Sequence, residues 1–434
     1  MNRLLFILAI IMALPASGKY NALPARYAGS MMPYDLSREE IQTVWADSLT
    51  PVYMARVARH GARYISSASK LDRLKAAIAE ARERKTLTKE GERFNRLLSD
   101  VETATADRWG DLSEVGVTEE HRLADGIFTM LPELFRTARI NAISSYVPRV
   151  VKTAYEFTYQ LTSLSGHTEI TVAEGRRFNP LLRCFETDKD YAAWRKSGAW
   201  KEQVALMTDS LVSPAPARRI FGAYLSDKDA RQLTLDIYDI LQSLSAFGLP
   251  AATDEFMTAQ EYEDCWKIDN LTHYLRNSIS PLSDLAGKAT SPLLARIIAD
   301  ADRSLSGRVE KAADRAAGIS GPEDDSVADM NLYFGHAETL MPLLSLMRVE
   351  GCYYDSPDLS TLYERWKDYD VVPLGANLDI ILLEAPSGTI HTALRHNGTY
   401  ISPMPGSGMT VEWNAYRQYL ISNIRTLQDA KTTR

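Results

Sequence analysis

The segment "PVYMARVARHGARYISS", residues 51–67, joins a short β-rich run to a turn in which charged and titratable side chains crowd around one glycine. Residues 51–59 have the composition of a short strand, and the strand ends at Arg59. Gly61 has no Cβ, so the chain is able to turn sharply there and to let a ligand approach the backbone closely. The segment therefore predicts a strand that delivers a functional loop.

The side chains of this loop suit a ligand that carries several anionic oxygens. The guanidinium groups of Arg59 and Arg63 match phosphate oxygens in a two-point fashion. Their positive charge disfavours protonation of His60, and a neutral imidazole nitrogen is able to attack phosphorus. The structural alternative is a surface turn with scattered basic residues. Arg56 lies three residues before Arg59 in the strand, so we expect it to face the opposite side.

Strand and helix patterns then place this loop in an α/β fold. Strand patterns recur at 141–147, 169–175, 330–336, 377–385 and 389–402, the last with a hairpin signal at Asn397-Gly398. Helix patterns occupy 68–85, 88–104, 118–135, 148–164, 201–212, 230–247, 258–276 and 291–307. For the helix at 118–135 we expect Gly116 to precede its start and Thr118 to cap it, and for the helix at 148–164 we expect Pro148 near its first position.

We predict a three-layer α/β/α domain with a central, mostly parallel sheet, interrupted by a mostly helical inserted domain. The α/β domain comprises residues 19–165 and 323–434, and the insertion comprises residues 166–322. In such folds the functional site lies at the ends of the strands.

The first 18 residues, "MNRLLFILAIIMALPASG", combine a basic residue, an apolar run and small residues in an A-x-G arrangement. This pattern is typical of a secretory signal peptide cut near Gly18, and it predicts a secreted or periplasmic protein. An N-terminal membrane anchor is the alternative, but the apolar run is short for a membrane span. We therefore expect no stable membrane insertion.

The net charge and the cysteines narrow the class of protein further. A formal net charge of −7 argues against a broad nucleic-acid-binding surface, because binding to a phosphate backbone needs a basic face. Three cysteines, Cys184, Cys265 and Cys352, allow at most one disulfide within the chain. Their spacing matches no zinc pattern. Any positive potential for an anionic small molecule must therefore be local.

A second chemical motif, His336-Ala337-Glu338, follows the strand at 330–336 and opens an apolar helix. The first turn of a helix favours anions through its free N–H groups and its dipole. Glu338 is therefore a candidate general acid, and His336 a candidate donor to phosphoryl oxygens. The alternative for Glu338 is an ordinary carboxylate at a helix N-terminus. Arg149 lies at another junction between a strand and a helix, where a solvated arginine is the alternative.

The order of these motifs resembles the histidine phosphatase superfamily, in its acid phosphatase and phytase branch. The likeness rests on Arg-His-Gly-x-Arg at 59–63, "LSEVGVTEEHRLADGIF" at 112–128, "SSYVPRV" at 144–150 and the late triplet at 336–338. That branch usually has His-Asp at the late position, whereas His-Ala-Glu is similar to the multiple inositol polyphosphate phosphatase group. "EGRRFNPLLRCFETDKDY", "FGHAETLMPLLSLM" and "PLGANLDIILLE" add to the resemblance, which is thin across residues 200–320.

The resemblance implies a phosphomonoesterase with a phosphohistidine intermediate. His60 would be the nucleophile and Glu338 the proton donor, and Glu338 would then assist water in the second step. The phosphoryl group would be held by a set of residues comprising Arg59, Arg63, Arg149, His336 and Ala337. No metal and no cofactor are implied, because the arginines and His336 would neutralise the developing charge.

The substrate implied by the resemblance is inositol hexakisphosphate (phytate), together with lower inositol polyphosphates. Neighbouring phosphates need further basic residues, and Arg183 is our candidate for this role. Arg176 and Arg177 have the pattern of ordinary surface charge. The alternatives are a broad-specificity acid phosphatase, a 2,3-bisphosphoglycerate phosphatase and a protein that only binds inositol phosphates. A pure binder needs the arginines, but it needs neither His60 nor Glu338.

The remaining histidines fit structural roles, because none has the spacing of a metal ligand with another candidate. They are His121, His167, His273, His391 and His396. The sequence leaves open the oligomeric state and the position on the ring that would be attacked first.

Overall fold

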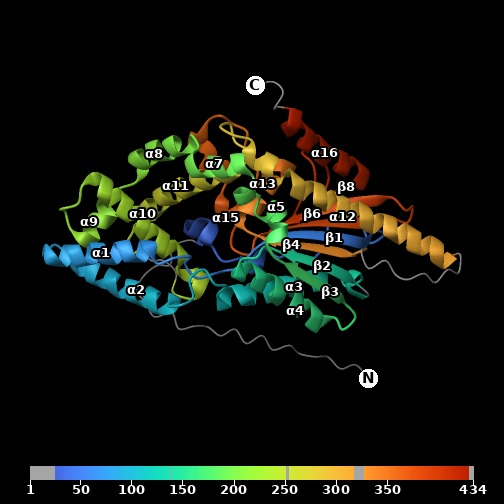
Figure 1. Cartoon of the computed structure of the whole chain (residues 1–434), viewed down its shortest axis with the longest axis horizontal. Coiled ribbons are helices and arrows are strands. Elements are labelled where there is room, and N and C mark those ends of the chain that lie inside the picture. Colours follow the sequence, from blue (N-terminus) through green and yellow to red (C-terminus); the bar gives the residue numbers. More distant parts are fainter. Residues whose placement is uncertain (1–24, 137, 251–253, 317–326, 430–434) are drawn as a thin grey trace.

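The computed structural model describes residues 25–136, 138–250, 254–316 and 327–429 (Figure 1). The expected signal peptide lies outside the described residues. Within them, no helix is long and apolar enough to cross a membrane.

A single eight-stranded sheet forms the centre of the molecule, in the order β3-β2-β4-β1-β5-β6-β7, with β8 paired to β6. The strands are β1 Thr50–Arg59, β2 Arg139–Ser144, β3 Glu169–Glu174, β4 Met330–Gly335, β5 Asn377–Glu384, β6 Ile390–His396, β7 Thr399–Ile401 and β8 Thr410–Glu412. The pairs β3–β2, β2–β4 and β4–β1 are parallel, whereas β1–β5, β5–β6, β6–β7 and β6–β8 are antiparallel. The sheet is therefore mixed, and the expected parallel character belongs to its β3-β2-β4-β1 half.

Helices cover both faces of this sheet, which gives the expected three layers (Figure 1). Strands β1 and β4 are buried on both faces, so their residues are mostly apolar and do not alternate between buried and exposed positions. On one face, α3 Glu114–Met130 and α4 Pro148–Leu164 pack against residues such as Met54 and Phe334. On the other, α12 Leu285–Ala316, α13 Ala337–Met347 and α16 Trp413–Asp429 pack against Val57 and Leu378.

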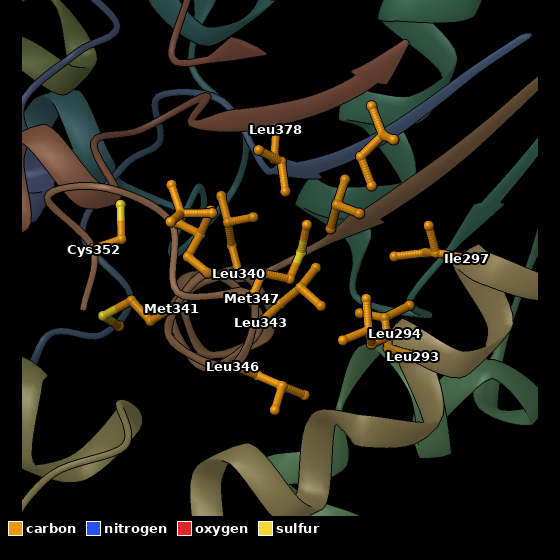
Figure 2. Packing of buried hydrophobic residues seen from close by; sticks show 14 of the residues in the cluster. Leu293, Leu294, Ile297, Leu340, Met341, Leu343, Leu346, Met347, Cys352 and Leu378 are labelled. Carbon is orange, nitrogen blue, oxygen red and sulfur yellow. The ribbon is translucent and has the colours of Figure 1, made fainter. Parts of the chain in front are cut away.

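The helix α13 is almost wholly buried, and it lies at the centre of this second core (Figure 2). Leu340, Leu343 and Met347 of α13 share a cluster with Ile297 of α12 and Leu378 of β5. Each fully buried side chain of this size contributes about 1.5–3 kcal/mol. The packing therefore fixes the position of the first turn of α13, which carries Glu338.

A separate helical body stands beside the sheet and has its own core, built from α1 Ser69–Glu83, α2 Lys89–Thr105, α9 Ala215–Phe221, α10 Asp227–Ser243 and α11 Ala259–Asn277. The remaining α-helices are α5 Asn179–Leu182, α6 Cys184–Thr187, α7 Lys189–Ser197, α8 Trp200–Leu211, α14 Leu362–Arg365 and α15 Asp368–Val371. Short 3-10 helices are η1 Ala25–Met31, η2 Leu36–Arg38, η3 Leu134–Arg136, η4 Arg176–Phe178, η5 Leu244–Phe247 and η6 Leu359–Thr361.

The helical insertion between β3 and β4 agrees with the expected architecture, but the packing of some elements crosses the expected boundaries. Strand β3, which we placed in the insertion, is the edge strand of the sheet. Helix α12 packs on the sheet, whereas α1 and α2 belong to the core of the helical body. The domain boundaries at residues 166 and 322 stay a prediction. Helices α1, α2 and α12 and strand β3 pack with a different part of the molecule from the one to which we assigned them by their position in the chain.

Local signals were mostly read correctly. Pro148 occupies the first turn of α4, as expected. The Asn397-Gly398 turn joins β6 to β7, with φ values of 45° and 82°, which suit this pair of residues. The expected start of α3 was wrong. The helix begins at Glu114, where the Ser113 side chain caps it by accepting a hydrogen bond from Gly116 N. All three cysteines are free and buried.

Candidate active site

Three segments that are distant in the sequence meet at one edge of the sheet. Arg59 at the end of β1 lies opposite Gly335 at the end of β4, and Phe334 lies opposite Ser144 at the end of β2. The three strands are parallel, so the residues that follow them emerge at the same edge. His60, His336 and the segment 145–149 come together for this reason, as the sequence predicted.

The backbone of the loop after β1 is held by side chains and by a close backbone contact from helices α3 and α4. Gly61 N donates to Thr153 Oγ1 of α4 at 3.2 Å, and Ala62 N donates to Glu119 Oε2 of α3 at 2.8 Å. A Cβ on Gly116 would stand 2.2 Å from Ala62 O, which real side chains never do, so α3 and the loop touch backbone to backbone. Gly61 is similarly enclosed by Gly116 and Glu120. The two glycines thus set the position of the loop.

His60 is buried and is oriented by its own loop. Its Nδ1 lies 3.0 Å from Gly61 O, and since a carbonyl oxygen only accepts, Nδ1 carries the ring proton. The lone pair is then on Nε2. Burial, followed by the positive charges of Arg149 and Arg59, holds the pKa of His60 well below the ordinary 6.5. The neutral imidazole that the sequence suggested is therefore the stable form here.

Three arginines surround this imidazole. Burial is the largest cause that lowers the pKa of Arg59 to about 10 and that of Arg63 to about 9, and it also lowers the pKa of Arg149. Arg59 is anchored by Nη1, which donates to Ser30 O and Val372 O. The Nε atoms of all three are buried without a hydrogen-bond partner in the described part of the chain. Buried donors of this kind are normally satisfied, so the arrangement is complementary to an anion.

His336 stands across from His60, with the two ring centroids 5.8 Å apart. Its Nε2 is 2.6 Å from Arg183 Nη1 and 3.1 Å from Ser145 Oγ. A guanidinium only donates, so Nε2 accepts, and the ring proton is on Nδ1. Burial is the main cause that lowers the pKa of His336 to about 3.

Glu338 lies in the first turn of α13, next to Ala337, the residue with which that helix begins. Its Oε1 accepts a hydrogen bond from Arg195 Nη2 at 3.0 Å. Burial acts to raise the pKa of Glu338, but the positive charges around it, that of Arg195 foremost, outweigh burial and lower the pKa to about 2. Without a ligand the carboxyl group is therefore ionised.

The structure also places the secondary candidates. Arg183 is 8% exposed, forms an ion pair with Glu186 and contacts His336, so it belongs to the site. Arg176 stacks on Tyr146, and Arg177 stacks on Phe178.

Several of the other residues that we set apart have structural partners. Arg56 is buried in an ion pair with Asp379, and His121 bonds to Glu156. In the described ranges, no group of three or more His, Cys, Asp or Glu residues is arranged to hold a metal ion.

Sequence reasoning missed several polar residues near this site. Arg195 contacts Glu338 from α7, and Ser145 contacts His336. Glu119 and Glu120 are buried behind residues 60–63, the loop that follows β1 and that we propose as the catalytic loop. The adjacent glutamates inside an apolar helical pattern were a usable signal for burial. Nothing in the local sequence distinguishes Arg195 from the basic residues around it.

Comparisons with known proteins agree with this geometry. The family model of the histidine phosphatase superfamily (branch 2) matches residues 53–401. No curated protein sequence matches the chain. Multiple inositol polyphosphate phosphatase from Bifidobacterium longum, in complex with inositol hexasulfate, superposes with a TM-score of 0.71 at 14% identity, over 92% of this chain and 98% of that one. The phytase from D. castellii superposes with a TM-score of 0.63 at 15% identity, over 92% of this chain and 85% of that one.

The superpositions show a shared fold, and the family model covers most of the chain, including the loop at 59–63 and the triplet at 336–338. The chain therefore belongs to branch 2 of the histidine phosphatase superfamily and is a phosphatase of the histidine type.

Proposed function

We propose that the chain hydrolyses phosphomonoesters of inositol polyphosphates, phytate among them, through a phosphohistidine intermediate. The observation that carries the proposal is the state of His60: a neutral ring with its lone pair on Nε2, surrounded by three arginines. The Nε donors of these arginines have no hydrogen-bond partner among the residues that the structure describes. The solved structure with inositol hexasulfate shows that a similar fold holds a ligand with six anionic groups.

In the first step, Nε2 of His60 attacks phosphorus, and the bond between phosphorus and the ester oxygen breaks. Arg59, Arg63 and Arg149 hold the nonbridging oxygens and stabilise the charge that develops on them. The ester oxygen leaves with a proton from Glu338. In the second step, Glu338 takes a proton from water, the water oxygen bonds to phosphorus, and His60 is released neutral.

Glu338 is ionised in the free site, so it must gain a proton before it acts as an acid. A bound phosphate dianion favours this protonation, because negative charge nearby raises the pKa of a carboxyl group. The dianion also engages Arg59, one of the positive charges that, after Arg195, lower the pKa of Glu338. Protonation of Glu338 is thereby coupled to substrate binding.

Arg183 is our candidate for contact with a second phosphate group, because it lies beside His336 at the edge of the primary site. For the same reason we propose that the substrate carries several phosphates. The N-terminal pattern at residues 1–18 supports secretion or export to the periplasm, which N-terminal sequencing of the mature protein would test.

The direct test is incubation of the purified protein with phytate without added metal, with measurement of free phosphate between pH 3 and 8. Rapid quenching in alkali, in which phosphohistidine survives, should trap a phosphorylated chain labelled at residue 60. His60→Ala should bind phytate and release no phosphate. No release by the wild-type chain at any pH would contradict the proposal, and release from an aryl phosphate alone would favour a broad-specificity acid phosphatase.

A further inference from the structure

Two arginines of the segment between β3 and β4 stand close to Glu338, and neither is needed to hold the reacting phosphate. Arg195 of α7 donates from Nη2 to Glu338 and from Nε to Asn277 Oδ1 at 3.1 Å. Asn277 is 2% exposed and follows Arg276 at the end of α11. The bond to Asn277 therefore ties Arg195 to the end of the helix that carries Arg276.

Arg276 is a cation that shares the negative charge of Glu338 with Arg195. It lies over the Trp200 ring, 5.2 Å from the ring centroid, and its Nε is buried with no hydrogen-bond partner. Within the described ranges it forms no ion pair. Burial, followed by the charge of Arg195, lowers the pKa of Arg276. Two arginines thus share the single carboxylate of Glu338, which leaves an excess of positive charge at this point.

The charged and titratable groups that act on Glu338 and its partners come from every side of the site. They are Arg195 and Tyr191 of α7, Arg276 of α11, Arg59 of β1, Arg63 of the loop, Arg149 of α4 and His336. A phosphate beside His60 accounts for the three arginines that surround the imidazole. It leaves Arg195 and Arg276 with the one carboxylate of Glu338 between them.

We propose that Arg195 and Arg276 form a second anion subsite, and that a second phosphate bound there takes Arg195 away from Glu338. This inference rests on the proposed function and goes beyond it, because it makes a second phosphate part of the activation of the acid. The Nη2–H bond to Glu338 Oε1 breaks and a bond from Nη2–H to a phosphate oxygen forms. Glu338 then takes a proton from water and later donates it to the leaving oxygen.

A substrate with one phosphate raises the pKa of Glu338 only through that phosphate and leaves the pair of Arg195 and Glu338 in place, so its leaving group receives less help from Glu338 than that of a polyphosphate. The subsite therefore discriminates polyphosphates from monophosphates by rate as well as by affinity. Arg195 is a specificity-determining and positioning residue in this scheme, because it acts on the reaction through Glu338.

The kinetic test compares Arg195→Gln, Arg195→Lys and wild type on phytate and on glycerol 2-phosphate. A hydrogen bond to a charged group is worth about 1.5–3 kcal/mol, so Arg195→Gln should lower the ratio of the two kcat/KM values by about 10- to 100-fold. Arg195→Lys should recover part of this loss. Arg417→Gln, which removes an ion pair with Asp302 outside the site, is the matched control and should leave the ratio unchanged.

The pH profile provides a readout that simple misfolding would not produce. In Arg195→Gln the carboxyl of Glu338 loses its main positive neighbour, so the alkaline limb of kcat for glycerol 2-phosphate should shift to higher pH. An unchanged limb together with an unchanged substrate ratio would overturn the inference.

Binding separates this inference from the proposed function. In a His60→Ala background, which cannot turn over substrate, Arg195→Gln or Arg276→Gln should weaken phytate binding about tenfold or more, and it should affect inorganic phosphate much less. Equal weakening of both ligands, or of neither, would refute the subsite even if the wild-type chain hydrolyses phytate. Failure of the proposed function would appear differently, as a wild-type chain that releases no phosphate from phytate.

Discussion

The contact between α3 and the catalytic loop makes Gly116→Ala a severe test of how the site is positioned. The added Cβ would lie 2.2 Å from Ala62 O and 2.7 Å from Ala62 N, whereas an ordinary contact begins at 3.4 Å. Both atoms belong to the backbone, so no side chain can rotate away, and the helix must move from the loop by roughly 1 Å. Overpacking of this kind costs about 1–3 kcal/mol.

Turnover should fall strongly even in the fraction of the chain that stays folded. His60 and Arg63 belong to the displaced loop, and a misplacement of about 1 Å lowers turnover on the order of 100-fold. Chemical unfolding and phosphate-release kinetics on phytate measure the two effects separately. We expect a lower free energy of unfolding and a far lower kcat in a chain that is still folded.

Gly126→Ala is the matched control in the same helix. Its new Cβ would meet no backbone atom outside the helix, only Glu39 Oε2 at 3.3 Å, and alanine favours helix over glycine by about 0.5–1 kcal/mol. We expect an unfolding free energy within about 1 kcal/mol of wild type and an unchanged kcat. Gly116→Ala with wild-type stability and a kcat within about threefold of wild type would refute the argument.

Three further predictions concern buried and charged groups. Burial raises the pKa of Glu119 from 4.5 to about 7. The contribution of this carboxyl to the free energy of unfolding is therefore fully present below pH 4.5 and is lost as the pH rises through 7. The total loss is about 3 kcal/mol. The stability difference between wild type and Glu119→Gln should therefore change across that window, and a constant difference in urea unfolding would contradict this. Glu338→Ala should slow release of poor leaving groups most, and an equal loss on an activated aryl ester would argue against its role as acid. Arg183→Asp should lower kcat/KM for phytate more than for small monoesters, whereas an unchanged ratio would remove Arg183 from the substrate-binding set.

Much of the site could be predicted because its main residues occupy special places in the chain. Arg59 ends a strand, Glu338 begins a helix after a strand, and Arg149 lies in the first turn of α4. Parallel strands place such positions at one edge of the sheet. The charge pattern around His60 also implied a neutral imidazole. If the arginines and His60 bind one phosphate, they lie close together, and at that distance the guanidinium charges disfavour protonation of the ring.

Other features required the fold. The sequence placed the start of α3 four residues late, because Gly116 resembles a helix boundary when its close contact with Ala62 is unknown. Strand β3 pairs with β2 although it lies inside the predicted insertion, since pairing depends on the path of the chain and not on strand pattern. Arg195 resembles any arginine in the last turn of a helix until the fold brings it to Glu338 of α13.

The sequence by itself determined which residue types stand at the ends of strands and at the starts of helices. It thereby determined the class of chemistry, because the positions of these ends depend on local backbone geometry and the chemistry depends on charge. Tertiary structure alone decided which cations face Glu338. Arg195 and Glu338, for example, are 143 positions apart, and a local sequence pattern contains no information about a contact at such a separation.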